Sequence, residues 1–549
     1  MILVEQIKIP IGERALATKG SSHEQEELKR ALCKKLACKS DSIPEFEIVK
    51  KSVDARRKPD IFYIYSLKLN MSIKELSKRA DFKNIKEYTE EVYTFPYEKL
   101  SGIEEEKRPV IVGFGPGGIF IGLELAKAGF RPIILERGSQ VEKRSKDVED
   151  FWKTGRLNPN SNVQFGEGGA GTFSDGKLNT NTGGRGGRSA RVIKTFASYG
   201  APEAILYDNK PHIGTDILTD VVKNIREEIK ALGGEIYFDS RFDRLIIEGN
   251  RVVGLTFTDL NSGQEKQIKT SSVCLAIGHS ARDTFVNIHK DGLDMESKAF
   301  AVGIRMEHPQ SLIDKNMYGE NLGSLRKELS LATADYKLTA KSKEGRGVYS
   351  FCMCPGGFVV NSSSEKGRLV VNGMSYHDRD SANANSAIIV NVNQDDFGHG
   401  LFDGMNFQRE LENSAYKIAS GRIPIQRLGD FKIGEVTKKL GEVIPQTKGD
   451  YAFADLNRVL PGYISQAIKD VIPDFNRKIP GFDMDDALCL GVESRTSSPI
   501  RIKRDENLMS SIKGVFPCGE GAGYAGGITS AAVDGIKVAE AVAGWIMEK

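Results

Sequence analysis

The chain has 549 residues, of which 40% are hydrophobic and 28% are charged, and its formal net charge is only +3. This balance is typical of a folded globular protein and excludes a strong overall attraction to nucleic acid or to anionic membranes. Its seven cysteines are too few for a disulfide scaffold and indicate a reducing compartment, and no cysteine–histidine set has zinc spacing. We find neither a secretory leader pattern nor a membrane-spanning apolar run, so we expect a cytoplasmic protein without bound metal.

The hydrophobic pattern changes along the chain and predicts an α/β protein in five segments. The N-terminal segment shows strand-like and helix-like stretches in the order βαββαβ, with helices near 23–37 and 71–80, which indicates a ferredoxin-like α+β domain. Strand–helix alternation then predicts a Rossmann-type domain that is interrupted by a mixed α+β region. We expect a ferredoxin-like domain at 1–95, a linker at 96–108, the first part of the Rossmann-type domain at 109–294, an inserted substrate or cap domain at 295–480, and the C-terminal part at 481–549.

A glycine-rich turn follows the first strand of the α/β region. Gly113, Gly115 and Gly118 have the spacing of a dinucleotide-binding turn and open a helix of small residues. The first glycine permits the tight turn, the second lets the backbone approach a pyrophosphate, and the third allows close packing of helix on strand. Glu136 ends the next strand, where an acid can accept hydrogen bonds from a ribose. We assign to this part of the site Gly113, Gly115, Pro116, Gly117, Gly118, Glu136 and Arg137.

The C-terminal segment 514–529 resembles the second FAD-binding fingerprint of glutathione-reductase-type flavoproteins. In that family the acid after the strand binds the ribityl chain, and the N-terminus of the next helix faces the N1/O2 edge of the flavin. The positive end of a helix dipole would stabilise negative charge on reduced flavin. The resemblance implies FAD as the cofactor, held here by Gly519, Glu520, Gly526, Gly527, Ile528 and Thr529.

Two further segments agree with this resemblance. The glycine-rich loop 162–177 stands where such flavoproteins contact FAD, which implies roles for Gly168, Gly169, Gly171 and Thr172. Ala276 and Gly278 close a buried strand as Ala-Thr-Gly does in the family, with isoleucine in place of threonine. The motifs FGEGGAGTFSDGKL, AIGHSARD, CMCPGGFVV, ESRTSSPIRI and GEGAGYAGGITSAA are similar to those of uncharacterised bacterial FAD-dependent dehydrogenases, also described as NAD(FAD)-utilising. That resemblance covers most of the chain and leaves the substrate open.

Four residues are candidates for the chemistry beside the flavin. Cys352 and Cys354 form a Cys-x-Cys pair that could accept electrons or attack a substrate, or could lie in a structural loop next to the flavin. Arg495 could hold an anionic substrate or stabilise an anionic flavin, or form a structural salt bridge. His377 could act in acid–base catalysis or lie in a surface loop.

The electron donor and the partners are less determined. No second Gly-x-Gly-x-x-Gly follows a strand, so we expect no dedicated NAD(P)H domain, although NAD(P)H could bind transiently as a donor. We therefore expect an FAD-dependent oxidoreductase acting on a small organic molecule, in an oligomeric state that the sequence does not disclose. Basic residues at 50–58 leave a flavin-dependent RNA-modifying enzyme as one alternative, and a flavin redox sensor without turnover as another.

Overall fold

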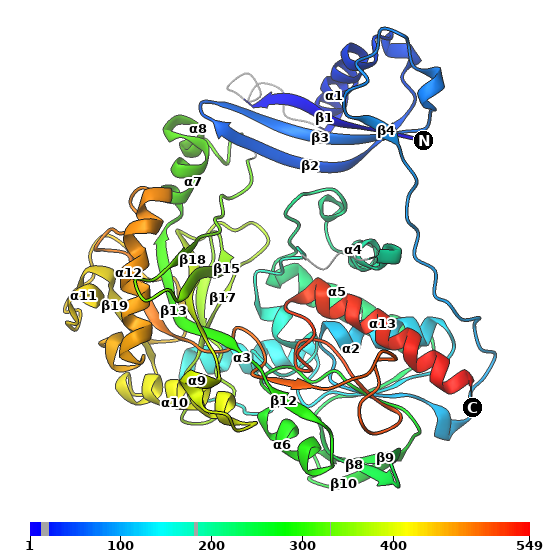
Figure 1. Ribbon diagram of the computed structural model, residues 1–549, viewed down its shortest axis with the longest axis vertical. Helices are drawn as coiled ribbons and strands as arrows, with labels where there is room; N and C mark the ends of the chain where they lie inside the picture. The colour runs from blue at the N-terminus through cyan, green and yellow to red at the C-terminus, as the bar shows by residue number, and fades with distance from the viewer. Residues whose placement is uncertain (12–20, 180–184, 330, 549) are drawn as a thin grey trace.

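The computed structural model describes residues 1–11, 21–179, 185–329 and 331–548 (Figure 1). A small N-terminal domain lies above two larger units, an α/β core and a second mixed domain beside it, and an extended segment leads from the N-terminal domain past the core. The α/β class expected from the sequence is confirmed. Across these described ranges, no helix has the length and apolarity that crossing a bilayer requires.

The N-terminal domain is an antiparallel sheet in the order β2-β3-β1-β4 with one helix. This is the strand order expected for a ferredoxin-like domain. The prediction of a helix near 71–80 is wrong, because only a 3₁₀ turn forms there, at Ile73–Glu75. The following residues find partners at the end of α1 instead: the N–H of Asp81 donates to the carbonyl of Lys35 at 2.8 Å. The elements are β1 (Ile2–Ile11), α1 (Ser21–Leu36), β2 (Phe46–Arg57), β3 (Asp60–Leu69) and β4 (Ile85–Glu87).

The core is built on a parallel sheet in the order β24-β11-β5-β6-β7. Its strands are short apolar runs, and both faces are covered, as buried parallel sheets require. One face packs against helices, and the other packs against a three-stranded meander and one helix. The first and last helices, α2 and α13, pack closely because both carry glycine at the contact: a Cβ on Gly535 would lie 2.4 Å from the carbonyl oxygen of Gly117. The sheet strands are β5 (Val110–Val112), β6 (Ile133–Leu135), β7 (Glu235–Tyr237), β11 (Val273–Leu275) and β24 (Val515–Pro517). The helices are α2 (Pro116–Lys127), α3 (Val141–Thr154), α4 (Arg188–Ser198), α5 (Thr215–Ala231), α6 (Arg282–Lys290) and α13 (Ile528–Met547).

Two small sheets extend the core. An antiparallel meander has the order β10-β9-β8, and a two-stranded ribbon joins β12 to β23. The ribbon pairs residues 295–297 with residues 500–502, so the chain leaves for the second domain and returns from it side by side. These strands are β8 (Ser240–Glu248), β9 (Arg251–Asp259), β10 (Glu265–Lys269), β12 (Met295–Ser297) and β23 (Ile500–Ile502).

The second domain is a seven-stranded mixed sheet in the order β14-β15-β18-β13-β22-β19-β21, with a small sheet β17-β16-β20 beside it. Strand β22 lies inside the large sheet, so this domain extends past the boundary expected at residue 480. The strands are β13 (Phe300–Pro309), β14 (Thr339–Lys341), β15 (Gly347–Cys354), β16 (Phe358–Asn361), β17 (Val371–Met374), β18 (Asn383–Val392), β19 (Ile423–Arg427), β20 (Thr447–Lys448), β21 (Tyr451–Phe453) and β22 (Leu488–Glu493). The helices are α7 (Gln310–Tyr318), α8 (Glu320–Ser324), α9 (Gln394–Phe397), α10 (Asp403–Ile418), α11 (Leu428–Ile433) and α12 (Gly462–Lys478).

Candidate functional site

A cavity of about 1220 Å³ lies where the carboxyl ends of the parallel core strands meet the second domain. The turns after β5, β6, β11 and β24 line it from the core, and β15, β17 and β22 line it from the second domain. Ligands of open α/β sheets bind at this edge. The volume exceeds the roughly 300–1,000 Å³ of ordinary small-molecule pockets, so the cavity has room for a dinucleotide and a second molecule.

The three glycines of the β5–α2 turn meet different surroundings. Gly113 has a φ of +99°, and a Cβ there would lie 2.5 Å from the carbonyl oxygen of Ala276. A Cβ on Gly118 would lie 2.0 Å from the carbonyl oxygen of Gly113. Gly115 differs, because its φ of −81° suits any residue and a Cβ would meet nothing closer than the Cα of Gly169 at 3.6 Å. The fold therefore requires glycine at the first and third positions, and not at the second.

Glu136 is held at the edge of the cavity by backbone donors. Its Oε2 accepts from the N–H of Phe114 at 2.8 Å, and its Oε1 accepts from the N–H groups of Gly138 and Gly166, each at 2.9 Å. A carboxylate has about four acceptor sites, so these bonds fix its orientation and leave capacity for a ligand hydroxyl. Arg137 lines the cavity next to it.

The turn after β24 brings a second acid to the cavity. Glu520 Oε1 lies 3.8 Å from Nε2 of His279, which follows β11. Burial raises the pKa of Glu520 to about 7, against the opposing attraction of Lys298. Burial, and then the nearby Arg495, lower the pKa of His279 to about 3, so its imidazole is neutral at physiological pH. Helix α13 begins directly after Gly527 and presents its N-terminus to the same cavity.

The two cysteines of the Cys-x-Cys pair lie at the end of β15, on the cavity wall. Cys352 has a φ of +41°, at an irregularity in the pairing of β15 with β18, and its side chain is exposed. Cys354 is buried, and its thiol donates to the carbonyl of Cys352 at 3.3 Å. Although the Cys352 side chain is exposed to the open cavity, the surrounding protein excludes enough water to raise the pKa of its thiol, and Arg305 opposes this shift. The thiol is therefore protonated at neutral pH, which favours a proton-holding role over a nucleophilic one. A strained backbone at such a place is typical of functional sites.

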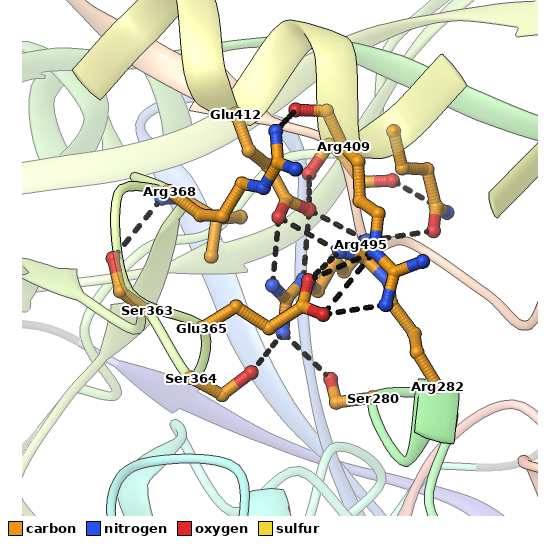
Figure 2. A network of polar contacts seen from close by, with 12 residues as sticks. Ser280, Arg282, Ser363, Ser364, Glu365, Arg368, Arg409, Glu412 and Arg495 are labelled. Carbon is orange, nitrogen blue, oxygen red and sulfur yellow. Dashed lines mark hydrogen bonds and ion pairs between the residues drawn. The ribbon is translucent and has the colours of Figure 1, made fainter. Parts of the chain in front are cut away.

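Arg495 lines the cavity, but its guanidinium takes part in a buried ionic network (Figure 2). Glu412 accepts from Nε and Nη2 of Arg495, each at 2.8 Å, and from both terminal nitrogens of Arg282 at 2.7 and 2.9 Å. Burial disfavours the charge on Glu412, yet the two arginines outweigh burial and lower its pKa. Arg495 also donates to Ser280 and Ser364. Of the three roles considered for Arg495, this geometry supports the structural salt bridge, which joins the core to the second domain.

His377 is placed outside the residues that line the cavity. Its ring stacks on His212 with centroids 5.2 Å apart, and its Nδ1 contacts the carbonyl of Ile213 at 2.9 Å. The structure thus gives His377 a framework role and does not bring it to Cys352 or Arg495.

Two of the five basic residues near β2 form ion pairs within the described part of the protein. Lys51 pairs with Glu24 at 2.8 Å and lies 4.7 Å from the ring centroid of Tyr63, and Arg56 pairs with Asp54 at 2.8 Å. These ion pairs offset two of the five positive charges that suggested an RNA surface.

Comparison with known proteins agrees with the flavin motifs. Residues 299–496 match a family model described as "FAD-dependent protein, C-terminal domain-like", and residues 1–70 match a domain of unknown function. An uncharacterized protein of Clostridium beijerinckii is 48% identical over 520 residues, covering 93% of this chain and 95% of that protein. The chain belongs to the family of that protein. The family-model match supports FAD as the cofactor of this family member.

Solved flavoproteins are more distant from this family. The flavin-dependent brominase Bmp2 is 14% identical with a TM-score of 0.37, covering 81% of this chain and 80% of that one. A glycine oxidase from Bacillus cereus is 10% identical with a TM-score of 0.35, covering 80% of this chain and 97% of that one. These TM-scores are too low to carry an argument about this chain.

Most of the predicted site residues line the cavity. They are Gly113, Gly115, Pro116, Gly117, Glu136, Arg137, Gly169, Gly171, Ala276, Gly278, Cys352, Cys354, Arg495, Gly519, Glu520, Gly526, Gly527 and Ile528. Gly118, Gly168, Thr172 and Thr529 lie behind these residues and contribute to packing and backbone bonding. The sequence analysis missed Lys177, His279 and Glu493 as lining residues. Their positions inside the motifs FSDGKL, AIGHSARD and ESRTSSPIRI were the available signal.

Within the described ranges, no group of three or more histidine, cysteine or acidic side chains is arranged to hold a metal ion.

Proposed function

We propose that this protein is an FAD-dependent oxidoreductase that binds FAD noncovalently in the large cavity and exchanges hydride or electrons with a small organic substrate. The family-model match supports FAD as the cofactor, and the residues that line the cavity support the place where FAD would bind. When bound, FAD supplies the redox chemistry at its isoalloxazine ring, and the protein supplies position and electrostatics.

The observation that carries the proposal is the pattern of glycines around the cavity. A Cβ on Gly278 or Gly526 would meet no protein atom within 4 Å, and a Cβ on Gly115 would make only an ordinary contact. None of the three has a positive φ. Neither packing nor backbone conformation explains glycine at these positions. A cofactor lying against the backbone does explain it, because a side chain would fill the space that the cofactor needs.

The two ends of FAD would meet different groups. The N-terminus of α2, from Gly115 to Gly117, offers backbone N–H groups and the positive end of a helix dipole to the pyrophosphate. Glu136 would accept from the ribose with the acceptor capacity that its backbone bonds leave free. Glu520 would bind the ribityl chain, as in glutathione-reductase-type flavoproteins. The N-terminus of α13 would hold the N1/O2 edge and stabilise negative charge there.

The substrate would approach from the second domain, where β15 brings Cys352 to the cavity wall. Lys177 lies near both cysteines and reduces their pKa shifts. The protonated thiol of Cys352 could donate a hydrogen bond or a proton to a substrate oxygen, while Lys177 attracts negative charge. The electron donor in this scheme would be NAD(P)H. It would bind only transiently, because the sequence carries no second glycine fingerprint for a dedicated NAD(P)H domain.

The proposal is tested on the purified protein. We expect a yellow protein that releases FAD, and not FMN, on heat denaturation, and whose flavin is bleached under anaerobic conditions by NADH or NADPH and reoxidised by the true substrate. Gly115→Ala should bind FAD more weakly, whereas Gly102→Ala, at an exposed linker position with no atom within 4 Å of the new Cβ, should bind it as the unaltered protein does. Colourless protein that cannot be reconstituted with FAD would refute the proposal.

A further inference from the structure

The cavity extends beyond the segments assigned to FAD into an arm built mainly by the second domain, to which the core contributes Lys210. The arm is lined by the C-terminal half of α7, by residues 335–338, and by the end of α12 with the residue after it. The residues used in the argument are Ile313, Met317, Lys337, Leu338, Lys478 and Ile479. None of the FAD motifs lies in these segments, so FAD binding leaves this part of the cavity unexplained.

One side of the arm is apolar. Ile313, Leu338 and Ile479 are 2%, 3% and 7% exposed, and Met353 on the neighbouring strand is 4% exposed. All four belong to or border the main core of the second domain, so the wall is fixed by packing. A rigid apolar wall of this kind favours an aliphatic or aromatic body over a polar one.

The other side of the arm is cationic. Lys210 is neutralised by Asp335, with 2.5 Å between Nζ and Oδ1. Lys478 donates to the carbonyl of Thr339 at 2.6 Å, which orients its ammonium without neutralising it. In the part of the chain that the structure describes, neither Lys337 nor Lys478 forms an ion pair with a carboxylate. The arm therefore keeps two uncompensated positive charges beside its apolar wall.

The N-terminal domain braces the outer end of this arm. Lys58, at the tip of the β2–β3 hairpin, donates to the carbonyl of Asn316 in α7, and Asn316 itself lines the cavity. Asn316 also donates to the carbonyl of Pro480, at 3.0 Å, which ties α7 to the segment after α12. These bonds fix the position of α7 relative to the N-terminal domain and to the segment after α12.

We propose that this arm is the substrate subsite and that the substrate class is an amphipathic organic anion, with its apolar body on the wall of Ile313, Leu338 and Ile479 and its anionic head at Lys337 and Lys478. The assignment of the anion as a flavin substrate rests on the proposed function. The binding of the anion to the arm does not. A carboxylate or a phosphate head fits the two ammonium groups equally, because each lysine acts as a point charge.

Binding can be measured by isothermal titration calorimetry of the purified protein with octanoate, octyl phosphate, octanol and octylamine. We expect the two anions to bind more tightly than octanol and octylamine to show no specific binding. Which anion binds more tightly distinguishes a carboxylate from a phosphate source. Affinity should rise up to roughly fourfold per methylene from hexanoate to decanoate. It should fall between 50 and 500 mM salt, because added ions screen exposed charges.

Variants locate the binding. Lys337→Ala combined with Lys478→Ala should weaken octanoate binding about tenfold or more, and the single variants Lys337→Gln and Lys478→Gln should each show part of that loss. Lys343→Ala is the matched control, because this lysine is 83% exposed and pairs with Asp470 away from the cavity lining. Equal binding of octylamine and octanoate, no octanoate binding, or an unchanged affinity in the double variant would overturn the proposal. FAD content is read separately from absorbance, so anion binding without flavin would refute the proposed function and leave the anion site standing.

Discussion

The contrast between Gly115 and Gly118 gives the sharpest prediction, because the same substitution should act through different states of the protein. A Cβ on Gly118 would lie 2.0 Å from the carbonyl oxygen of Gly113, so alanine there must displace the backbone of the turn. A Cβ on Gly115 would lie 3.6 Å from its nearest neighbour, the Cα of Gly169, in ordinary van der Waals contact. Gly118→Ala should therefore destabilise the apoprotein, and Gly115→Ala should weaken the binding of FAD.

The magnitudes follow from the geometry. Overpacking of a rigid site costs about 1–3 kcal/mol or more, which we expect in the unfolding free energy of the Gly118→Ala apoprotein. For Gly115→Ala, the loss of glycine at an N-cap position costs about 0.5–1 kcal/mol. Alanine also reduces the entropy of the unfolded chain, which stabilises the folded state by about 0.4–1 kcal/mol. The unfolding free energy of the apoprotein should therefore be nearly unchanged. When FAD binds, the new Cβ would clash with the pyrophosphate at the same overpacking cost of about 1–3 kcal/mol. This cost weakens FAD binding roughly 5- to 150-fold.

Two measurements separate these effects. Urea unfolding of the apoproteins gives the stability of each variant, and quenching of FAD fluorescence on titration gives the dissociation constant. The reasoning is refuted if Gly115→Ala binds FAD as tightly as the unaltered protein, or if it destabilises the apoprotein as much as Gly118→Ala does. In either case, glycine at position 115 would be required for a reason other than contact with the cofactor.

Three further predictions concern buried and titrating groups. Glu412→Gln should cost about 3–5 kcal/mol in urea unfolding, because it leaves the buried Arg495 without a counter-charge and Arg282 with Glu365 alone. Glu365→Gln, at a residue with a 27% exposed side chain, should cost much less, and equal losses would contradict the network. The pKa of Glu520 is raised from 4.5 to about 7, so the folded apoprotein holds this proton more tightly than the unfolded chain and loses stability as pH rises through that window. Glu520→Gln should remove this part of the decline between pH 5 and pH 8, measured by urea unfolding at both values, and an unchanged slope would contradict the assignment. Because the pKa of Cys352 is about 12, its alkylation by iodoacetamide should be slow at pH 7.5 and accelerate up to pH 10, as followed by mass spectrometry; fast, pH-independent labelling would contradict a protonated thiol.

The sequence was sufficient to predict that the residues of the glycine-rich motifs meet at one cavity, because its signals are local. The glycines of the β5–α2 turn and the acid at Glu136 occur at fixed spacings around single strands, and the carboxyl ends of parallel strands must meet at one edge. The C-terminal turn with Glu520 joins this edge because β24 pairs in parallel with β11. Local spacing together with parallel pairing was therefore sufficient to bring together residues more than 380 positions apart, such as Glu136 and Glu520.

The helix expected near 71–80 shows where local pattern fails. Its residues have acceptable helical spacing, but the backbone of Asp81 bonds to the end of α1, and Lys35 forms an ion pair with the Asp81 side chain at 3.2 Å. Within the segment, the N–H groups of Glu75, Leu76 and Ala80 donate to carbonyls three positions earlier, so the chain forms separate turns that this tertiary contact follows. Propensity over so short a segment is weak, so contacts of this kind decide the outcome.

The role of Arg495 could not be decided from sequence, because its partner is distant and unmarked. Glu412 lies 83 residues before Arg495 and 130 after Arg282, in a helix whose pattern reads only as amphipathic. Burying one carboxylate between two guanidiniums is stable only if both cations stay, so Arg495 cannot leave Glu412 to bind a substrate without exposing a buried charge. The cost of that step argues that anion recognition falls to cations without such a partner. Lys337 and Lys478 meet this requirement, and they lie on the wall of the same cavity.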